Sequence, residues 1–386
     1  MASVAAHSVA RASPSDGVRV LRAQAGGYDG IVPGPILQVR RGDEVRIRLV
    51  NELAEPTALH WHGVRLTNKM DGAPPLTQAL VAPGDSFDYR FIAPDAGTFW
   101  YHPPQRMPRS HYGVLIVREA APVDVDYDHT LTFDDTALAA AADLPTFTVN
   151  GASNFDMCAG QNERLRLRLL NASTDRVLDL RVAGLRTFVM ATDGEPALPF
   201  AAREGRLSLG PGNRMDVFVD CTLTPGTSAA ITMERADADA IPLARIACAA
   251  GASSRPAPRD DPKPLPANPL PERMDFTGAF HLEAAMGVKS QAAARNGPPL
   301  FRVTRGRTVI LGLLNSTSGT EAMHLHGHSF RLLDSLDDGW KPFWLDTMPV
   351  APRTHPRIAF VADNPGQWLI EGLAAKEDPA AWFEVT

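Results

Sequence analysis

The stretch RGDEVRIRLVN at residues 41–51 decides the fold, because two similar stretches follow it: QNERLRLRLLN at residues 161–171 and RGRTVILGLLN at residues 305–315. Each alternates apolar and polar residues and closes with Asn, and a period of two indicates a strand with one buried and one solvent-facing side. Similarity in a constant register indicates an internal repeat. The repeated pattern therefore predicts that the chain contains three copies of one strand-rich unit.

Further blocks repeat after each of these strands in the same order. The second block reads VAPGDSFDYRF from residue 81, LGPGNRMDVFV from residue 209 and VAPRTHPRIAF from residue 350. A third block begins at Gly97, Gly226 and Gly366, and an apolar strand closes each copy. Short strands, Pro-Gly turns and no long helical period indicate an all-β fold of three consecutive Greek-key β-sandwich domains.

The length of 386 residues exceeds the size at which one hydrophobic core usually divides into several. The proline-rich stretch AGASSRPAPRDDPKPLPANPLP from residue 250 is typical of a linker. We expect domain 1 at residues 18–120, domain 2 at 121–250, the linker at 251–272 and domain 3 at 273–386.

Composition limits the function classes. A net charge of −6 without a basic stripe argues against nucleic-acid binding. The sequence has no run of about 18 apolar residues, so we expect no segment that spans a membrane. Ala10-Arg11-Ala12 resembles a signal-peptidase site, but the apolar stretch before it is weak, which indicates a processed or trimmed start. Three cysteines do not form a disulfide framework. Cys221 and Cys248 could pair, and Cys158 is expected to be a buried or semi-buried thiol.

Two histidine motifs occupy the same position of the first and third repeats. His60-Trp61-His62-Gly63 and His324-Leu325-His326-Gly327 both begin nine residues after the closing Asn, where the second repeat has Leu180-Arg181-Val182. Residues i and i+2 of a strand face the same way, roughly 6.6 Å apart. Two facing pairs predict a histidine-walled metal site between domains 1 and 3, and its imidazoles favour copper on intrinsic affinity.

Other polar residues join this pattern in register. His102 lies five residues after Gly97, and its counterpart five residues after Gly366 is Glu371. His328 follows the third-repeat pair at i+2 and is expected to orient a ligand or to pack under the site. We expect four further histidines, which have no partner in register, to be solvated: His111, His129, His281 and His355.

These motifs resemble the three-domain multicopper oxidases, the family of laccases, ascorbate oxidase and bacterial copper-resistance oxidases. The resemblance is carried by HWHG at His60, DAGTFWYH ending at His102, YGVLIV at Tyr112 and MHLHGHSF at Met323. It implies three cupredoxin-like domains that hold four coppers. A type 1 copper in domain 3 would take electrons from substrate, and a trinuclear cluster between domains 1 and 3 would reduce dioxygen to water.

The resemblance assigns ligands to only part of that cluster. It implies that His60 and His324 bind the type 2 copper, that His62 and His102 bind one type 3 copper, and that His326 binds the other. Where the family has further ligands, this chain has different residues. They are Pro104 in place of a histidine, Glu371-Gly372-Leu373 in place of His-Cys-His, Glu321 at the early type 1 position, and residues 374–379 at the remaining type 1 positions.

These departures predict a reduced copper site. A blue copper site needs a thiolate, and the third repeat contains no cysteine, so we expect no type 1 copper at Glu321 and Gly372. The expected function is a copper-binding oxidoreductase with one or two coppers that acts on a small molecule or dioxygen. The alternative is a non-catalytic copper-binding or scaffold protein. Glu371 would either join His326 in holding an ion or be an exposed acid, and the resemblance implies a periplasmic or secreted location.

Overall fold

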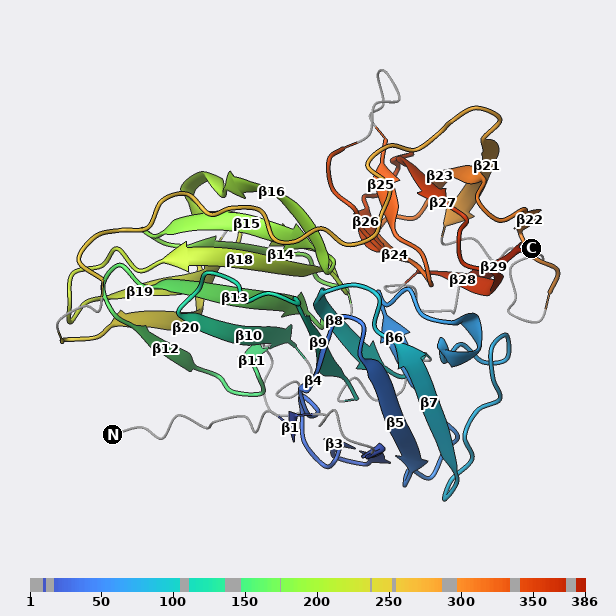
Figure 1. The fold of residues 1–386 in the computed structure, drawn as a ribbon, viewed down its shortest axis with the longest axis horizontal. Helices are drawn as coiled ribbons and strands as arrows, with labels where there is room; N and C mark the ends of the chain where they lie inside the picture. The colour runs from blue at the N-terminus through green and yellow to red at the C-terminus, as the bar shows by residue number, and fades with distance from the viewer. Residues whose placement is uncertain are drawn as a thin grey trace. The chain divides into compact units, whose positions relative to one another are not determined.

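The computed structural model describes residues 10–11, 17–104, 111–135, 147–173, 175–236, 238–251, 255–286, 297–333, 341–372 and 380–386. The chain forms two compact units. The outer-repeat unit comprises Val9–Ala120, Asp193–Glu195 and Ala267–Thr386, and the middle-repeat unit comprises Ala121–Thr192 and Pro196–Pro266. Strands dominate both units, and the 3-10 helices in the described residues are η1 (Asn68–Met70) and η2 (Arg203–Gly205) (Figure 1). The all-β prediction is confirmed.

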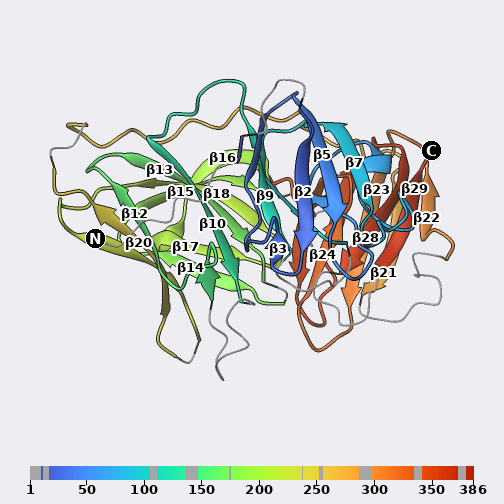
Figure 2. The ribbon, with the colours of Figure 1, turned by 90° about the horizontal axis from the view of Figure 1, so that it is seen from below.

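The first repeat forms two sheets of the outer-repeat unit. One sheet has the order β1 (Ala10–Arg11), β4 (Leu37–Arg40), β9 (Gly113–Arg118), β8 (Gly97–His102) and β6 (His60–His62). The other has the order β3 (Gly27–Tyr28), β2 (Arg19–Gln24), β5 (Glu44–Asn51) and β7 (Ser86–Ile92), and Figure 2 shows β2, β5 and β7 side by side. Alternate residues of β5 are buried, as the period of two predicts: Val45, Ile47 and Leu49.

The third repeat forms two sheets of the same unit. One has the order β21 (Phe280–Met286), β23 (Thr308–Asn315), β27 (Arg357–Val361) and β25 (Phe330–Leu332). The other has the order β22 (Phe301–Val303), β29 (Ala380–Val385), β28 (Gly366–Gly372), β24 (Glu321–Leu325) and β26 (Thr347–Val350). The strands β6 and β24, which carry the histidine motifs, therefore belong to one compact unit.

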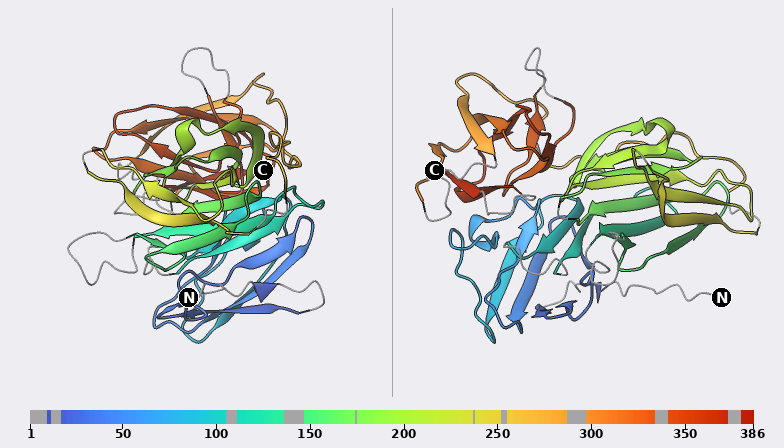
Figure 3. Two further views of the ribbon diagram at one scale, coloured as in Figure 1. Left: turned by 90° about the vertical axis from the view of Figure 1, so that its left-hand side faces the viewer. Right: turned by 180° about the vertical axis from the view of Figure 1, so that it is seen from behind.

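The second repeat forms the sheets of the middle-repeat unit, which Figure 3 shows from two sides. One has the order β11 (Thr148–Val149), β10 (Tyr127–Asp134), β13 (Arg164–Asn171), β18 (Arg214–Asp220), β15 (Arg186–Thr192) and β16 (Glu195–Ala201). The other has the order β12 (Phe155–Ala159), β20 (Ile241–Cys248), β19 (Ser228–Met233), β14 (Leu178–Val182) and β17 (Arg206–Leu209).

The Asn that closes each repeated strand makes the same hydrogen bonds in all three repeats. Its buried side-chain amide donates to the carbonyl at the start of the second block, and its oxygen accepts the N–H two residues further on. The three amide hydrogen bonds run from Asn51 Nδ2 to Val81 O at 2.8 Å, from Asn171 Nδ2 to Leu209 O at 2.9 Å and from Asn315 Nδ2 to Val350 O at 2.8 Å. A buried carbonyl needs a donor, so this amide ties the strand end to the next block.

The arginines of β13 are not on a solvent-facing side, contrary to the alternation in the sequence. Arg164, Arg166 and Arg168 are each at most 2% exposed. Arg164 Nε donates to Asp220 at 2.6 Å, and Arg166 Nη2 donates to Asp216 at 2.5 Å. Charged side chains are buried only when they are paired, and these ion pairs meet that requirement.

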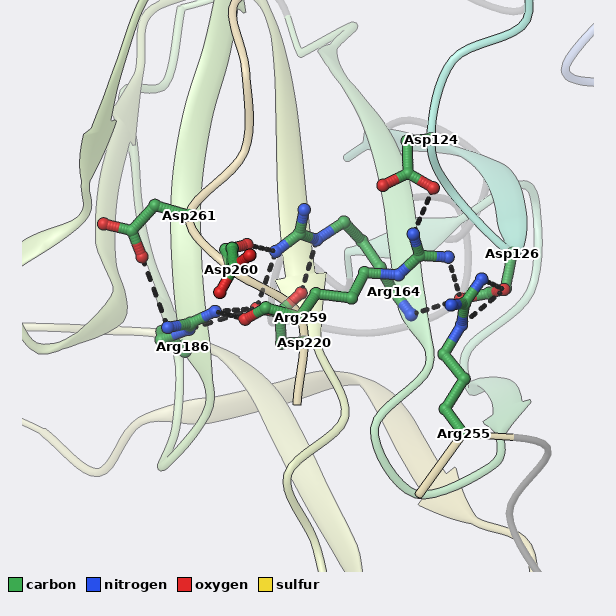
Figure 4. A network of polar contacts seen from close by, with 9 residues as sticks. All are labelled: Asp124, Asp126, Arg164, Arg186, Asp220, Arg255, Arg259, Asp260 and Asp261. Carbon is green, nitrogen blue, oxygen red and sulfur yellow. Dashed lines mark hydrogen bonds and ion pairs between the residues drawn. The ribbon is translucent and has the colours of Figure 1, made fainter. Parts of the chain in front are cut away.

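The proline-rich segment contributes to this burial. Arg164 Nη2 donates to Asp260 O at 2.8 Å, and Arg259 forms ion pairs with Asp124 and Asp126 (Figure 4). Leu265 is 6% exposed and packs in a small apolar cluster of the middle-repeat unit. The start of the proline-rich segment is therefore a covering layer of this unit.

Three further sequence features have clear outcomes. Cys158 is exposed, so the expected buried thiol is wrong, while Cys221 and Cys248 are buried and free. Within the described part of the chain, no helix is long and apolar enough to cross a membrane. Ala12 of the signal-peptidase-like motif lies outside the described residues, whereas Ala10 and Arg11 form β1.

Candidate metal centre

Two equivalent strand pairs carry the polar residues of the outer-repeat unit. In the first repeat, His60 of β6 lies directly opposite His102 of β8. In the third repeat, His324 of β24 lies directly opposite Glu371 of β28. Glu371 is thus the structural counterpart of His102.

Three pairs of side chains each bring two potential metal-binding atoms close together, and they are called donor pairs here. The first donor pair joins the first and third repeats. His60 Nε2 and His324 Nε2 lie 3.2 Å apart, and both side chains are at most 1% exposed. The other ring nitrogen of each histidine, here called the outer nitrogen, faces a backbone carbonyl. His60 Nδ1 lies 2.9 Å from Asp71 O, and His324 Nδ1 lies 3.0 Å from Asp346 O.

The anchoring of the outer nitrogens decides what the inner nitrogens can do. A carbonyl only accepts, so each Nδ1 carries the proton, and the Nε2 lone pairs of His60 and His324 then face each other. Two buried lone pairs at that distance need a proton or a cation between them. The pair therefore fits a metal ion that accepts imidazole.

The second donor pair lies within the first repeat. His62 Nδ1 and His102 Nε2 are 3.1 Å apart. Their other nitrogens have oxygen partners, because His62 Nε2 lies 2.7 Å from Thr347 Oγ1 and His102 Nδ1 lies 2.8 Å from Pro103 O. This pair also fits a metal, with His62 using Nδ1 and His102 using Nε2.

The third donor pair lies within the third repeat and mixes two kinds of ligand. His326 Nε2 lies 3.3 Å from Glu371 Oε2, and its outer Nδ1 lies 2.8 Å from Asp71 Oδ2. Glu371 is 7% exposed, so it is not an exposed strand-end acid.

The rings of the two repeats alternate in space. His62 stacks on His324 with centroids 3.6 Å apart, and His60 stacks on His326 with centroids 3.9 Å apart. Stacking restrains the ring planes of these four histidines, so their inner nitrogens are held in place before any ion is bound.

Burial and neighbouring charges set the protonation of these imidazoles. Burial lowers the pKa of His102 to about 3 and that of His324 to about 4. Burial alone would also lower the pKa of His326, but the carboxylates of Asp71 and Glu371 outweigh it and raise that pKa to about 9. His102 and His324 are therefore neutral at pH 7, as metal ligands must be.

Three residues that position the ligands carry no recognisable sequence signal: Asp71, Asp346 and Thr347. Asp71 follows η1, and its buried carboxylate lies 3.3 Å from His60 Nδ1 as well as close to His326. Burial would raise the pKa of Asp71, but His326 and His60 hold it well below its usual range. A carboxylate or carbonyl that orients a metal-binding imidazole is a common outer partner of metal sites.

Asp193 supports the third-repeat side of the centre. Its Oδ2 accepts the N–H groups of Asp346 at 3.3 Å and Thr347 at 3.2 Å. The turn that anchors His324 therefore depends on a carboxylate from a short segment far away in sequence, which no pattern around His324 could indicate.

The other histidines of the described residues contribute no nitrogen to these three pairs. His328 packs against the rings of Phe360, Trp368 and Phe383, and its Nδ1 lies 3.1 Å from His326 O. His111 is 2% exposed and bonds to Gln24 O, so the expectation that it is solvated is wrong.

His129 is half-buried, whereas His281 and His355 are exposed, as expected for both. At the type 1 positions, Glu321 lies on β24 and Gly372 on β28, and Met323 pairs with Gly372 in the sheet. Residues 373–379 lie outside the described residues.

Known proteins match this chain along almost its whole length. Models of multicopper oxidase domains match residues 10–122, 123–236 and 266–372. A multi-copper oxidase from Pseudomonas thermotolerans is 30% identical, with a TM-score of 0.84 over 96% of this chain and 99% of that one. Lac15 from a marine microbial metagenome is also 30% identical, with a TM-score of 0.84 over 96% of this chain and 100% of that one.

A curated relative points the same way. Multicopper oxidase MmcO of Mycobacterium tuberculosis is 27% identical over 89% of this chain and 79% of its own length. Three matched segments in order, two full-length structural likenesses and a pair of histidine motifs in register lead to one conclusion. The chain belongs to the multicopper oxidase family.

Proposed function

We propose that this chain is a copper-dependent oxidoreductase that works without a type 1 copper. In this proposal, copper binds to the imidazole pairs His60/His324 and His62/His102, one ion at each, and exchanges electrons there with a small molecule or dioxygen. The observation that carries the proposal is the 3.2 Å approach of two buried Nε2 atoms from different repeats.

The two pairs differ in access. His60, His62 and His324 are at most 1% exposed, whereas His102 is only half-buried. A reductant would therefore meet the centre on the side of His102. Asp71 and Asp346 would hold the proton on the outer nitrogens of His60 and His324, which keeps both Nε2 lone pairs available to the metal.

The proposed loss of the type 1 copper rests on residue chemistry. Glu321 and Gly372 offer no thiolate and no imidazole, and a blue copper site requires both. Without that relay, electrons have to be delivered directly to the buried centre. This restricts the substrate to a small molecule and disfavours oxidation at a remote surface position.

The alternative is a copper-binding or scaffold protein without turnover. The nearly complete burial of the first donor pair favours it, because a closed site is slow to exchange ligands. Both proposals share the copper-binding histidines, and they differ only in whether dioxygen is consumed. The domain bounds 18–120, 121–250 and 273–386 and a periplasmic or secreted location belong to the same proposal.

The test is copper binding followed by turnover in one set of variants. Copper per chain and the electron paramagnetic resonance spectrum are measured for the native chain, His60→Ala and His324→Ala, with the exposed His281→Ala as control. Dioxygen uptake is then measured with a small reductant.

The outcomes separate the two proposals. We expect one or two coppers per chain, lost or weakened in the first two variants and retained in the control. Dioxygen uptake that depends on His60 and His324 supports the oxidoreductase. Bound copper without uptake supports the alternative, and equal copper binding in all four proteins rules out this centre.

A further inference from the structure

The third donor pair differs chemically from the other two. His60/His324 and His62/His102 offer imidazole alone, whereas the third pair offers one imidazole and one carboxylate. The geometry points to a separate divalent-cation site at His326 and Glu371, which takes Zn²⁺ in preference to Cu⁺. This inference rests on the proposed copper binding by the other two pairs.

The position of Glu371 is that of a ligand. It faces His324 across β24 and β28, as His102 faces His60 across β6 and β8, so the carboxylate takes the place of an imidazole in the equivalent strand pair. At 7% exposed, Glu371 is largely removed from water. Burying a carboxylate is unfavourable unless a cation or donor compensates for the lost solvation; protonated His326 can do so in the metal-free protein, and a bound divalent cation would take over that role.

His326 directs its Nε2 toward that carboxylate, so a metal between the two would take the place of the proton on this nitrogen. Its Nε2 is buried and lies 3.3 Å from Glu371 Oε2, so the two side chains form an ion pair when His326 is protonated. Its Nδ1 is held by Asp71 Oδ2 at 2.8 Å. A carboxylate that holds one nitrogen of a histidine, while the other nitrogen faces the ion, is the arrangement that orients zinc-binding imidazoles.

The ligand types decide which ion fits. Cu⁺ prefers soft sulfur ligands and accepts imidazole, and a carboxylate is a poor partner for it. Zn²⁺ accepts histidine nitrogen and carboxylate oxygen together in a tetrahedral arrangement. Glu371 in front of His326 and Asp71 behind it supply two negative charges, which match one divalent cation and exceed what a monovalent one needs.

The consequence for the centre is a division of roles. Zinc has no redox chemistry in proteins, so an ion at His326 and Glu371 would supply charge and order. Electron transfer would be restricted to the two imidazole pairs. The replacement of one imidazole by Glu371 would thus change both the number and the kind of ions in the cluster.

The experiment loads two metals in sequence and counts both. The metal-free full-length chain is saturated anaerobically with Cu⁺, freed of excess, exposed to Zn²⁺, desalted and analysed for both metals. Glu371→Gln removes the carboxylate charge, and Glu371→His restores an imidazole at that place. Glu384→Gln is the control, because Glu384 lies near the end of β29 and pairs with the exposed Arg302.

The native chain and the control should retain copper and about one zinc ion. Glu371→Gln should keep its copper, which also shows that it is folded, and lose at least tenfold in zinc affinity. Glu371→His should gain about one copper and lose the zinc. Native protein without zinc, or equal zinc affinity in Glu371→Gln, would overturn the inference. Zinc that depends on Glu371 in a chain that binds no copper would overturn the proposed function and leave the cation site standing.

Discussion

Copper should stabilise the outer-repeat unit, because the first donor pair joins β6 of the first repeat to β24 of the third. An ion that binds only the folded state adds RT ln(1 + [L]/Kd), about 2.7 kcal/mol at a hundredfold excess over Kd. A unit of roughly 150–250 residues gains about 2–4 °C in Tm per kcal/mol. The expected rise is therefore about 5–11 °C.

The perturbation is the double variant His62→Ala with His326→Ala, accompanied by the single variants His60→Ala and His324→Ala. These substitutions also remove hydrogen bonds of the metal-free protein. Loss of His60 removes the histidine donor of the buried Asp71 carbonyl, at a cost of about 1–3 kcal/mol, whereas the Asp346 carbonyl keeps the N–H of Leu325 when His324 is lost. The quantity to compare is thus the copper-induced shift within each protein, and not the absolute Tm.

The assay is differential scanning calorimetry of each protein with and without copper. We expect the full shift in the native chain and in His281→Ala, and little or none in His60→Ala and His324→Ala. An intermediate shift is expected for the double variant, because it keeps the first donor pair. If copper raised the Tm of the native chain and of all histidine variants equally, the ion would bind elsewhere and the interface reasoning would be refuted.

Three further predictions concern colour, buried charge and pH. The copper-loaded protein should show no intense absorption near about 600 nm, because a blue copper site needs a thiolate; an intense band there would contradict the assignment. Asp220→Asn should lower the unfolding free energy, measured by chemical denaturation, by about 3–5 kcal/mol, because it removes the carboxylate charge that pairs with buried Arg164. Asp156→Asn removes one partner of an exposed ion pair and should cost at most about 1 kcal/mol. Similar costs for the two variants would argue against burial as the cause. The folded-state pKa of His326 is raised to about 9, so the stability that its protonation contributes is fully present below about pH 6.5 and is lost as pH rises through 9. The metal-free protein should therefore unfold more easily as pH rises over that range, and Glu371→Gln should weaken this pH dependence. An unchanged pH dependence in Glu371→Gln would show that another group causes it.

Repetition made much of the fold predictable. Strands can be recognised from the local alternation of apolar and polar residues. The closing Asn recurs because its side-chain amide donates to a buried carbonyl at the same place in each repeat. The histidine motifs could be matched between the first and third repeats for the same reason. The cross-strand equivalence of His102 and Glu371 also followed from counting residues in register.

Local alternation failed where long-range contacts decide burial. The arginines of β13 have the pattern of a solvent-facing side, yet Asp216, Asp220 and the backbone of Asp260 bury them. A strand pattern reports only which residues share a face. It does not report that a backbone carbonyl 96 residues later, at Asp260, lies over that face and accepts a hydrogen bond from Arg164.

By itself, the sequence determined the strand repeat, the family resemblance and the five histidines in register. Only the tertiary structure decided which nitrogen of each imidazole faces inward, because that depends on Asp71 and Asp346, which lie 11 and 22 residues from the histidines whose Nδ1 atoms their carbonyls accept. It also decided that Glu371 is buried beside His326. The physical reason is that a side chain's hydrogen-bond partners and its removal from water depend on how distant strands pack, which residue spacing along one strand does not encode.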